Sequence, residues 1–141
     1  MAVVRGDIHR IEIGAGTNVQ DASVLHVTHD GPYSPGGYPL TIGRNVTIGH
    51  RVVAHACTIG DHCLIGIGSV LMDGSVVDDY VMIGAGSLVP PRKRLAGGHL
   101  YVGSPVQQKR PLTEREREFL VHSAENYIRL KDRYLEAAYP V

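Results

Sequence analysis

The sequence predicts an all-β fold, a parallel β-helix of hexapeptide repeats, followed by one C-terminal α-helix. The first observation is an aliphatic residue at every sixth position from Ile59 to Val89, most often followed by glycine or another small residue. This period is typical of a β-helix whose coils have three short sides. The second is composition, because 17 glycines against one phenylalanine and no tryptophan in 141 residues suit tight corners around a slim core. The third is an uninterrupted helical stretch after Thr113.

The β-helix is expected to occupy residues 1–90. The chain begins in mid-pattern, so its first coil needs cover, either from a missing N-terminal coil or from another chain. Two steps of five residues then bring successive coils into register, and coils in register stack about 4.8 Å apart. These steps run from Val19 to Val24 and from Ile48 to Val53.

Three histidines fall at defined places on this scaffold. His26 and His55 occupy the same corner of adjacent coils, so their Cβ atoms should lie about 5 Å apart. Two nitrogens bound to one Zn²⁺ are separated by roughly 3.3 Å, which such a pair can reach. His50 lies one corner away, up to about 17 Å along an extended chain, so a site with all three needs His50 from a second chain. The alternative is that all three are surface residues at corners of the prism.

Three histidines that leave a fourth position open form the arrangement of catalytic zinc, which lowers the pKa of a bound water to about 7. Imidazole also suits Fe²⁺ and Co²⁺, so the residues leave the metal open among these three. Asn18 and Gln20 provide uncharged hydrogen-bonding groups for a bound hydroxide or a substrate.

A loop over residues 29–40 is expected to leave the prism directly beside His26. Its sequence, HDGPYSPGGYPL, contains too many prolines and glycines for a regular strand. Loops that a rigid scaffold places beside a site often line or gate it. The alternative is an inert insertion.

After Pro90-Pro91 the repeat is expected to end, because proline cannot donate to a β-ladder. Residues 91–112 are expected to form a polar connector, and residues 113–138 a helix packed on the prism or against a neighbouring chain. Thr113 and Glu116 have the spacing of a capping box. Apolar residues at helical spacing give the helix one apolar face: Phe119, Leu120, Tyr127, Leu130 and Tyr134.

Charge and hydropathy exclude several partners. Lysine plus arginine equals aspartate plus glutamate at 14 each, so no net field recruits nucleic acid or an anionic membrane. No apolar run approaches the ~20 residues of a membrane span, and the N-terminus has no signal-peptide pattern. We therefore expect a soluble cytoplasmic protein.

These motifs together resemble the γ-class carbonic anhydrase family, in particular its short bacterial branch, over essentially the whole chain. The resemblance rests on Arg5-Gly6-Asp7, Asn18-Val19-Gln20-Asp21, His26 and His50-x4-His55 within a hexapeptide prism that a helix follows. It implies a left-handed β-helix and a homotrimer with metal sites at its interfaces. Each site would take His26 and His55 from one chain and His50 from the next.

The resemblance also implies roles for other residues. Arg5 and Asp7 would form an interface ion pair, with Arg5 able to hold bicarbonate. Gln20 would orient the metal-bound hydroxide that attacks CO2, and Asn18 would support Gln20. A helix tyrosine would line the pocket: Tyr127, or alternatively Tyr134, unless these residues serve only helix packing.

The chain departs from the family pattern at the proton path. Highly active members carry a glutamate three residues after the first metal ligand, where this chain has His29, and an acidic residue where it has Ile8. His29, with an ordinary pKa of about 6.5, is a candidate proton shuttle.

Two other functions stay open. Hexapeptide acyltransferases bind acyl-CoA between prisms and use one histidine as base, and the segment from Tyr101 to Pro105, with Gln107, Lys109 and Arg110, is similar to their coenzyme-end segment. A metal-binding scaffold with little turnover is the third possibility.

Overall fold

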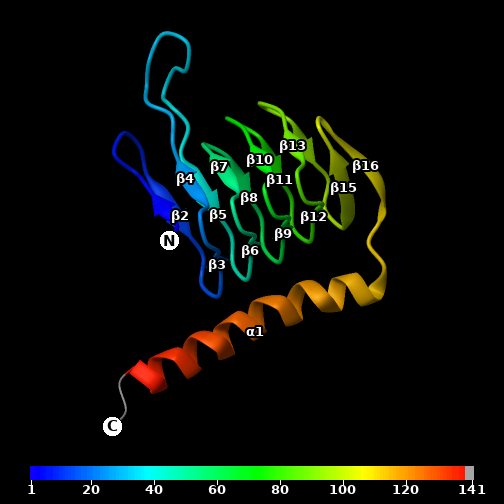
Figure 1. The fold of residues 1–141 in the computed structure, drawn as a ribbon. Coiled ribbons are helices and arrows are strands. Elements are labelled where there is room, and N and C mark those ends of the chain that lie inside the picture. Colours follow the sequence, from blue (N-terminus) through cyan, green and yellow to red (C-terminus); the bar gives the residue numbers. More distant parts are fainter. Residues whose placement is uncertain (139–141) are drawn as a thin grey trace.

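The computed structural model describes residues 1–138 as a three-sided prism of short strands with one long helix beside it (Figure 1). The strands form three sheets, which we call A, B and C. Successive strands up to β15 belong to different sheets, and the last strand, β16, pairs antiparallel with β15 in the same sheet. Sheet A contains β1 (Val3–Val4), β4 (Val24–His26), β7 (Val53–His55), β10 (Val70–Leu71) and β13 (Leu88–Val89). Sheet B contains β2 (Ile11–Ile13), β5 (Leu40–Ile42), β8 (Thr58–Ile59), β11 (Val76–Val77) and β14 (Arg94–Leu95). Sheet C contains β3 (Asn18–Val19), β6 (Thr47–Ile48), β9 (Leu64–Ile65), β12 (Met82–Ile83), β15 (His99–Gly103) and β16 (Val106–Pro111).

This left-handed parallel β-helix confirms the predicted fold class. Its core is a ladder in which each side of a coil contributes one inward aliphatic residue. From the second coil onward most of these side chains are fully buried: Ile42, Ile48, Ala54, Ile59, Ile65, Leu71, Val77, Ile83, Val89 and Leu95.

The predicted five-residue steps are wrong in position. Leu25 and Ala54 are fully buried, whereas Val24 is 36% exposed, so the inward residue of each pair is the second one. In both pairs, Val24–Leu25 and Val53–Ala54, the two residues are aliphatic. The pattern alone therefore could not show which of the two points inward. The short step lies one side later, between Ala54 and Ile59, at the corner that carries His55. The coil register itself is confirmed, because His26 pairs with His55.

Residues 91–112, which the sequence predicted as a polar connector, contain the strands β14, β15 and β16. Strand β14 pairs with β11, and β15 pairs with β12, which adds a further coil to the prism. The proline pair is tolerated because of its place in sheet A. One coil earlier, the equivalent residue Met72 donates its N–H to Val89 O in the following coil. Strand β13 is the last of sheet A, so an N–H at position 90 would have no following strand to bond.

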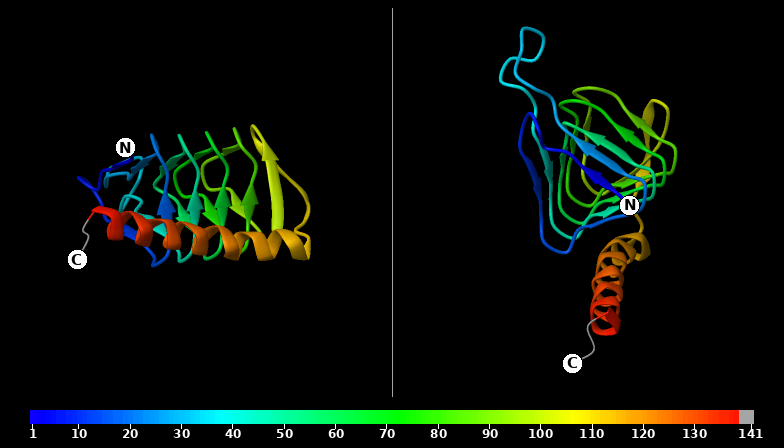
Figure 2. Two further views of the ribbon diagram at one scale, coloured as in Figure 1. Left: turned by 60° about the horizontal axis from the view of Figure 1, so that its bottom comes forward. Right: turned by 60° about the vertical axis from the view of Figure 1, so that its left-hand side comes forward.

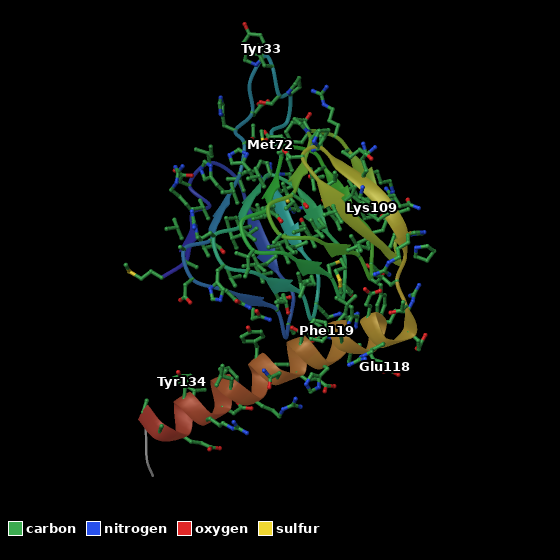
Figure 3. The ribbon with its side chains drawn as sticks, turned by 45° about the vertical axis from the view of Figure 1, so that its right-hand side comes forward. Tyr33, Met72, Lys109, Glu118, Phe119 and Tyr134 are labelled. Atoms are coloured by element: carbon green, nitrogen blue, oxygen red, sulfur yellow. The ribbon has the colours of Figure 1, made fainter. Side chains whose placement is uncertain are left out.

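The segment between β4 and β5 leaves the prism as a long excursion (Figure 1). Thr28 and Tyr38 close its root through two backbone hydrogen bonds. Tyr33, at the tip, is 93% exposed (Figure 3). The excursion therefore stands on the end of strand β4, which carries His26.

The C-terminal helix, α1 (Glu114–Ala138), runs along the prism (Figure 2). Its contact uses small residues, because Ser123 and Ala124 are buried beside Leu120 and the Ser123 hydroxyl lies 3.1 Å from that of Thr47. Of the predicted apolar face only Leu120 is buried, while Tyr134 is 70% exposed (Figure 3). Within residues 1–138, no helix is long and apolar enough to cross a membrane.

The helix begins with the predicted capping box, to which an ion pair is added. Thr113 N donates to the Glu116 carboxylate at 2.9 Å, and Glu116 N donates to Thr113 Oγ1 at 3.2 Å. Arg110 donates two further bonds to the same carboxylate. The bonds from Arg110, together with those from Thr113, lower the pKa of Glu116 from 4.5 to about 2.

We expect Glu116→Gln to lower the thermal midpoint at neutral pH. Because the pKa of Glu116 is depressed by folding, the stability that its charge provides is complete above about pH 4.5 and is lost as the pH falls toward 2. The difference in midpoint between wild type and variant should therefore shrink over this range, as followed by circular dichroism. Glu125→Gln, in the middle of α1, is the control, and a difference that stays constant down to pH 2 would refute the assignment.

Candidate metal centre

His26 and His55 form a pair at the ends of strands β4 and β7, where parallel pairing stacks one coil on the next. Their ring centroids are 5.1 Å apart. His26 Nδ1 lies 3.1 Å from His55 Nε2. This separation is close to the roughly 3.3 Å between two nitrogens that share one tetrahedral Zn²⁺.

A carboxylate faces the other nitrogen of each ring. Asp7 Oδ1 lies 3.1 Å from His26 Nε2, and Asp73 Oδ1 lies 2.6 Å from His55 Nδ1. An ionised carboxylate only accepts hydrogen bonds, so each of these ring nitrogens carries the hydrogen. The nitrogens that face each other then both present lone pairs, an arrangement that a cation between them would satisfy. The pair thus fits a metal ion.

Asp7 and Asp73 stay ionised at neutral pH. Desolvation by itself would raise the pKa of Asp7, but hydrogen bonds with His26 and Arg5 outweigh it and hold that pKa below its ordinary value. Desolvation of Asp73 is likewise outweighed by hydrogen bonds from Thr28 and His55, which lower the pKa of that carboxyl. Arg5 also forms an ion pair with Asp7, and its Nη2 lies 3.5 Å from His26 Nδ1.

We call this set, which consists of Arg5, Asp7, His26, His55 and Asp73, the His26 corner. A second set, the His50 corner, lies at the other edge of sheet A, where the chain passes from sheet C into sheet A. It consists of Asn18, Gln20, Asp21, His50 and Tyr127.

The His50 corner combines polar groups with an open groove. His50 Nδ1 lies 3.4 Å from Asp21 Oδ2, and Gln20 Nε2 donates to Asn18 Oδ1 at 3.4 Å. Gln20, His50 and Tyr127 all line one groove of about 480 Å³ between α1 and the prism. Asn18 and Gln20 thus lie beside His50 and not beside the His26–His55 pair.

The two corners do not meet within one chain. Among residues 1–138, no three histidine, cysteine or acidic side chains are grouped so that they could hold a metal. The pair at the His26 corner offers two nitrogens, whereas His50 lies at the other corner, where the chain passes from sheet C into sheet A. If all three predicted histidines are to bind one metal ion, His50 would have to come from a second chain.

Two other predicted residues lie apart from the pair. His29 sits at the root of the excursion near Gly31, and within residues 1–138 its side chain has no hydrogen bond to His26 or His55. Tyr134 lies on the outer part of α1, whereas Tyr127 lines the groove.

Sequence reasoning gave Asp21 no role beyond its place in a motif and missed Asp73, although both leave a signal. Asp21 precedes His50 by 29 residues, the same offset that separates His26 from His55. Asp73 follows His55 by 18 residues, which is one regular coil. Residues at coil offsets from a histidine are therefore candidates for contact with it.

Comparison with known proteins relates the whole chain to one group. Residues 56–91 match the family model described as bacterial transferase hexapeptide (six repeats). The chain is 58% identical to Protein YrdA of Escherichia coli over 96% of its own length and 74% of that protein. It is 42% identical to Gamma carbonic anhydrase 2, mitochondrial, of Arabidopsis thaliana over 91% of its length, but it spans only 46% of that protein.

Solved structures show the same prism. A hexapeptide transferase family protein from Anaplasma phagocytophilum superposes with a TM-score of 0.85 at 42% identity, covering 94% of this chain and 74% of that one. A Bacillus cereus protein whose name proposes an acetyltransferase gives a TM-score of 0.87 at 35% identity, covering 98% and 76%. Identity at this level, spread over nearly the whole chain, makes this chain a member of the hexapeptide-repeat family that includes Protein YrdA, and the chain is also similar to γ carbonic anhydrases.

Proposed function

We propose that the chain hydrates CO2 to bicarbonate at a metal centre shared by two chains of a homotrimer. The observation that carries the proposal is the His26–His55 pair, whose facing nitrogens lie 3.1 Å apart while carboxylates hold the opposite nitrogens. His50 of a neighbouring chain would complete the ligand set. Zn²⁺ is the first choice of metal, and Fe²⁺ or Co²⁺ also suit imidazole ligands. A Zn²⁺ with three histidine ligands lowers the pKa of a coordinated water to about 7, which supplies a nucleophile at neutral pH.

The placement of the two corners supports the trimer in this proposal. A contact that joins the His50 corner of one chain to the His26 corner of the next is heterologous, and three such contacts close a ring. The groove beside His50 supports an interface, since Ile67 and Phe119 on its wall are 54% and 50% exposed in the single chain. Large apolar side chains of this kind are typical of surfaces that a partner covers.

In this proposal, the polar residues of both corners bind the substrate or orient the nucleophile. Arg5, fixed by Asp7, would hold the bicarbonate anion through its guanidinium. Gln20 would orient the nucleophile through its amide, and Asn18, which accepts a bond from Gln20 Nε2, would fix that amide. Tyr127 would close the side of the pocket that α1 borders.

His29 is the proposed proton carrier. It lies at the root of the excursion, which stands on the end of the strand that carries His26, and imidazole is the side chain best suited to exchange protons with buffer near neutral pH. We place the reaction in the cytoplasm.

An acyl-CoA acyltransferase is the second candidate, because the matching family model and the solved relatives carry transferase names. A metal-binding scaffold with little turnover is the third. Zinc content, CO2 hydration and acyl-CoA consumption, measured on the same zinc-loaded sample, separate the three. We expect about one zinc per chain and CO2 hydration that chelation removes. Consumption of acyl-CoA without CO2 hydration would overturn the proposal.

The sharing of the site is tested by mixing two inactive variants. His50→Ala and His55→Ala chains, unfolded and refolded together, should regain activity, because about one quarter of the interfaces in random trimers combine an intact His50 with an intact pair. Zinc content and CO2 hydration, compared with each variant refolded alone, measure this recovery.

The matched control is a mixture of His26→Ala and His55→Ala chains. Both substitutions damage the same corner, so no combination of these chains rebuilds a complete site. Equal recovery in the two mixtures, or recovery in neither, would contradict a site shared between the His26 and His50 corners.

A further inference from the structure

Asp73 contacts His55 but belongs to a different coil. It lies in the turn after β10, 18 residues beyond His55, and its carboxylate bridges two partners. Oδ1 accepts a hydrogen bond from His55 Nδ1 at 2.6 Å, and Oδ2 accepts one from the Thr28 hydroxyl. Figure 3 labels the neighbouring Met72 near the base of the excursion, in agreement with the Thr28 contact.

The carboxylate determines which nitrogen of His55 carries hydrogen. A neutral imidazole has one N–H and one lone pair, and the bond that one nitrogen makes fixes the role of the other. Because Asp73 accepts at Nδ1, the lone pair of His55 is at Nε2. This nitrogen is the one that lies 3.1 Å from His26 Nδ1.

Thr28 holds the carboxylate itself in place. Its backbone closes the root of the excursion with Tyr38, and its hydroxyl binds the oxygen of Asp73 that His55 does not use. The chain of hydrogen bonds from Thr28 through Asp73 to His55 therefore fixes both the orientation of the His55 ring and the nitrogen that carries its hydrogen.

The Asp73 side chain is separate from the bonds that stack the coils at this turn. The contact to the following coil runs through its backbone carbonyl, which accepts from Arg92 N at 2.9 Å. Replacing the side chain thus leaves that bond in place.

We propose that Asp73 is a positioning residue that keeps His55 in the Nδ1–H form and presents Nε2 to the metal, with Thr28 orienting the carboxylate. This inference rests on the proposed metal centre. Carboxylates that hold a ligating histidine in this manner commonly contribute 10- to 100-fold to metal affinity.

The test compares Asp73→Ala, Asp73→Asn and Thr28→Val with wild type. The Zn²⁺ affinity of each purified trimer is measured by competition with a chromophoric chelator. We expect about a 10- to 100-fold loss for Asp73→Ala. Asp73→Asn should lose less, because an amide oxygen still accepts from Nδ1, and Thr28→Val should lose least.

The matched control is Asp79→Asn. Asp79 occupies the same position of the next turn, six residues on, and its carboxylate accepts from Asp61 N instead of a histidine. It should keep wild-type Zn²⁺ affinity. A loss equal to that of Asp73→Asn would overturn the proposal, because it would show only a general effect of turn carboxylates.

A second readout distinguishes this inference from the proposed function. Nitrogen-15 NMR of the metal-free protein reports which nitrogen of His55 carries hydrogen, which a merely structural role would not change. We expect the Nδ1–H form in wild type and a shift toward Nε2–H in Asp73→Ala. An unchanged form in Asp73→Ala overturns the role of Asp73, whereas a wild-type protein that binds no Zn²⁺ overturns the metal centre itself.

Discussion

Replacing His55 by alanine is expected to abolish metal binding and CO2 hydration. The substitution leaves His26 Nδ1 without its facing nitrogen and leaves Asp73 without the ring that it holds. Two remaining imidazoles from two chains hold the ion too weakly, and we expect the Zn²⁺ affinity to fall on the order of 10³-fold. Metal analysis after gel filtration, together with stopped-flow CO2 hydration, measures both losses.

His122→Ala is the control for this experiment. His122 lies on an exposed face of α1, so its removal should change neither the zinc content nor the rate. If His55→Ala retains one zinc per chain while His122→Ala is normal, the assignment of the ligand pair is wrong.

Replacing Gly66 by alanine is expected to destabilise the prism more than any exposed substitution. A Cβ at this position would lie 2.5 Å from Ala85 N and 2.6 Å from Ile83 O, which are backbone atoms of the next coil. These atoms cannot move away without breaking the bond from Gly66 N to Ile83 O, which is 2.8 Å long. Overpacking of this kind costs about 3 kcal/mol. For a chain of this size we expect the thermal midpoint to fall by roughly 10 °C.

Gly68→Ala separates this steric effect from the loss of backbone freedom. Gly68 has a φ of +70° but no heavy atom within 4 Å of the added Cβ, so only conformational strain of about 1 kcal/mol applies. Both variants are compared at one protein concentration, because oligomerisation shifts the midpoint. An equal or smaller effect at Gly66 would show that the coils are not in the tight contact described.

The fold was predictable because the residues that build its core recur at a regular interval in the sequence. One inward residue on each side of a coil forces the sequence to repeat, and the repeat also places His26 against His55. The errors arose where two neighbouring residues both satisfy the pattern, as Val24 and Leu25 do. Pro90 misled for a different reason, since its missing N–H matters only in a strand that another strand follows.

The site was less predictable because its geometry depends on contacts between coils. The spacing predicted the histidine pair, but the carboxylates that orient it come from Asp7 and Asp73, which are 19 and 18 residues from their partners. No local motif joins such residues. The division into two corners was predictable from spacing alone, whereas the grouping of Tyr127 with His50 required the path of α1.

In the proposed trimer, the two corners at opposite edges of sheet A would also determine how defective chains behave in a mixed population. A chain that lacks one corner damages one centre of its trimer, because it contributes that corner to one neighbour only. A chain that lacks both corners damages two of the three centres. When such chains equal the normal ones in number, about one quarter of the centres stay intact, since each needs a sound chain on both sides. Loss of both corners in one gene copy would therefore act as a dominant-negative allele.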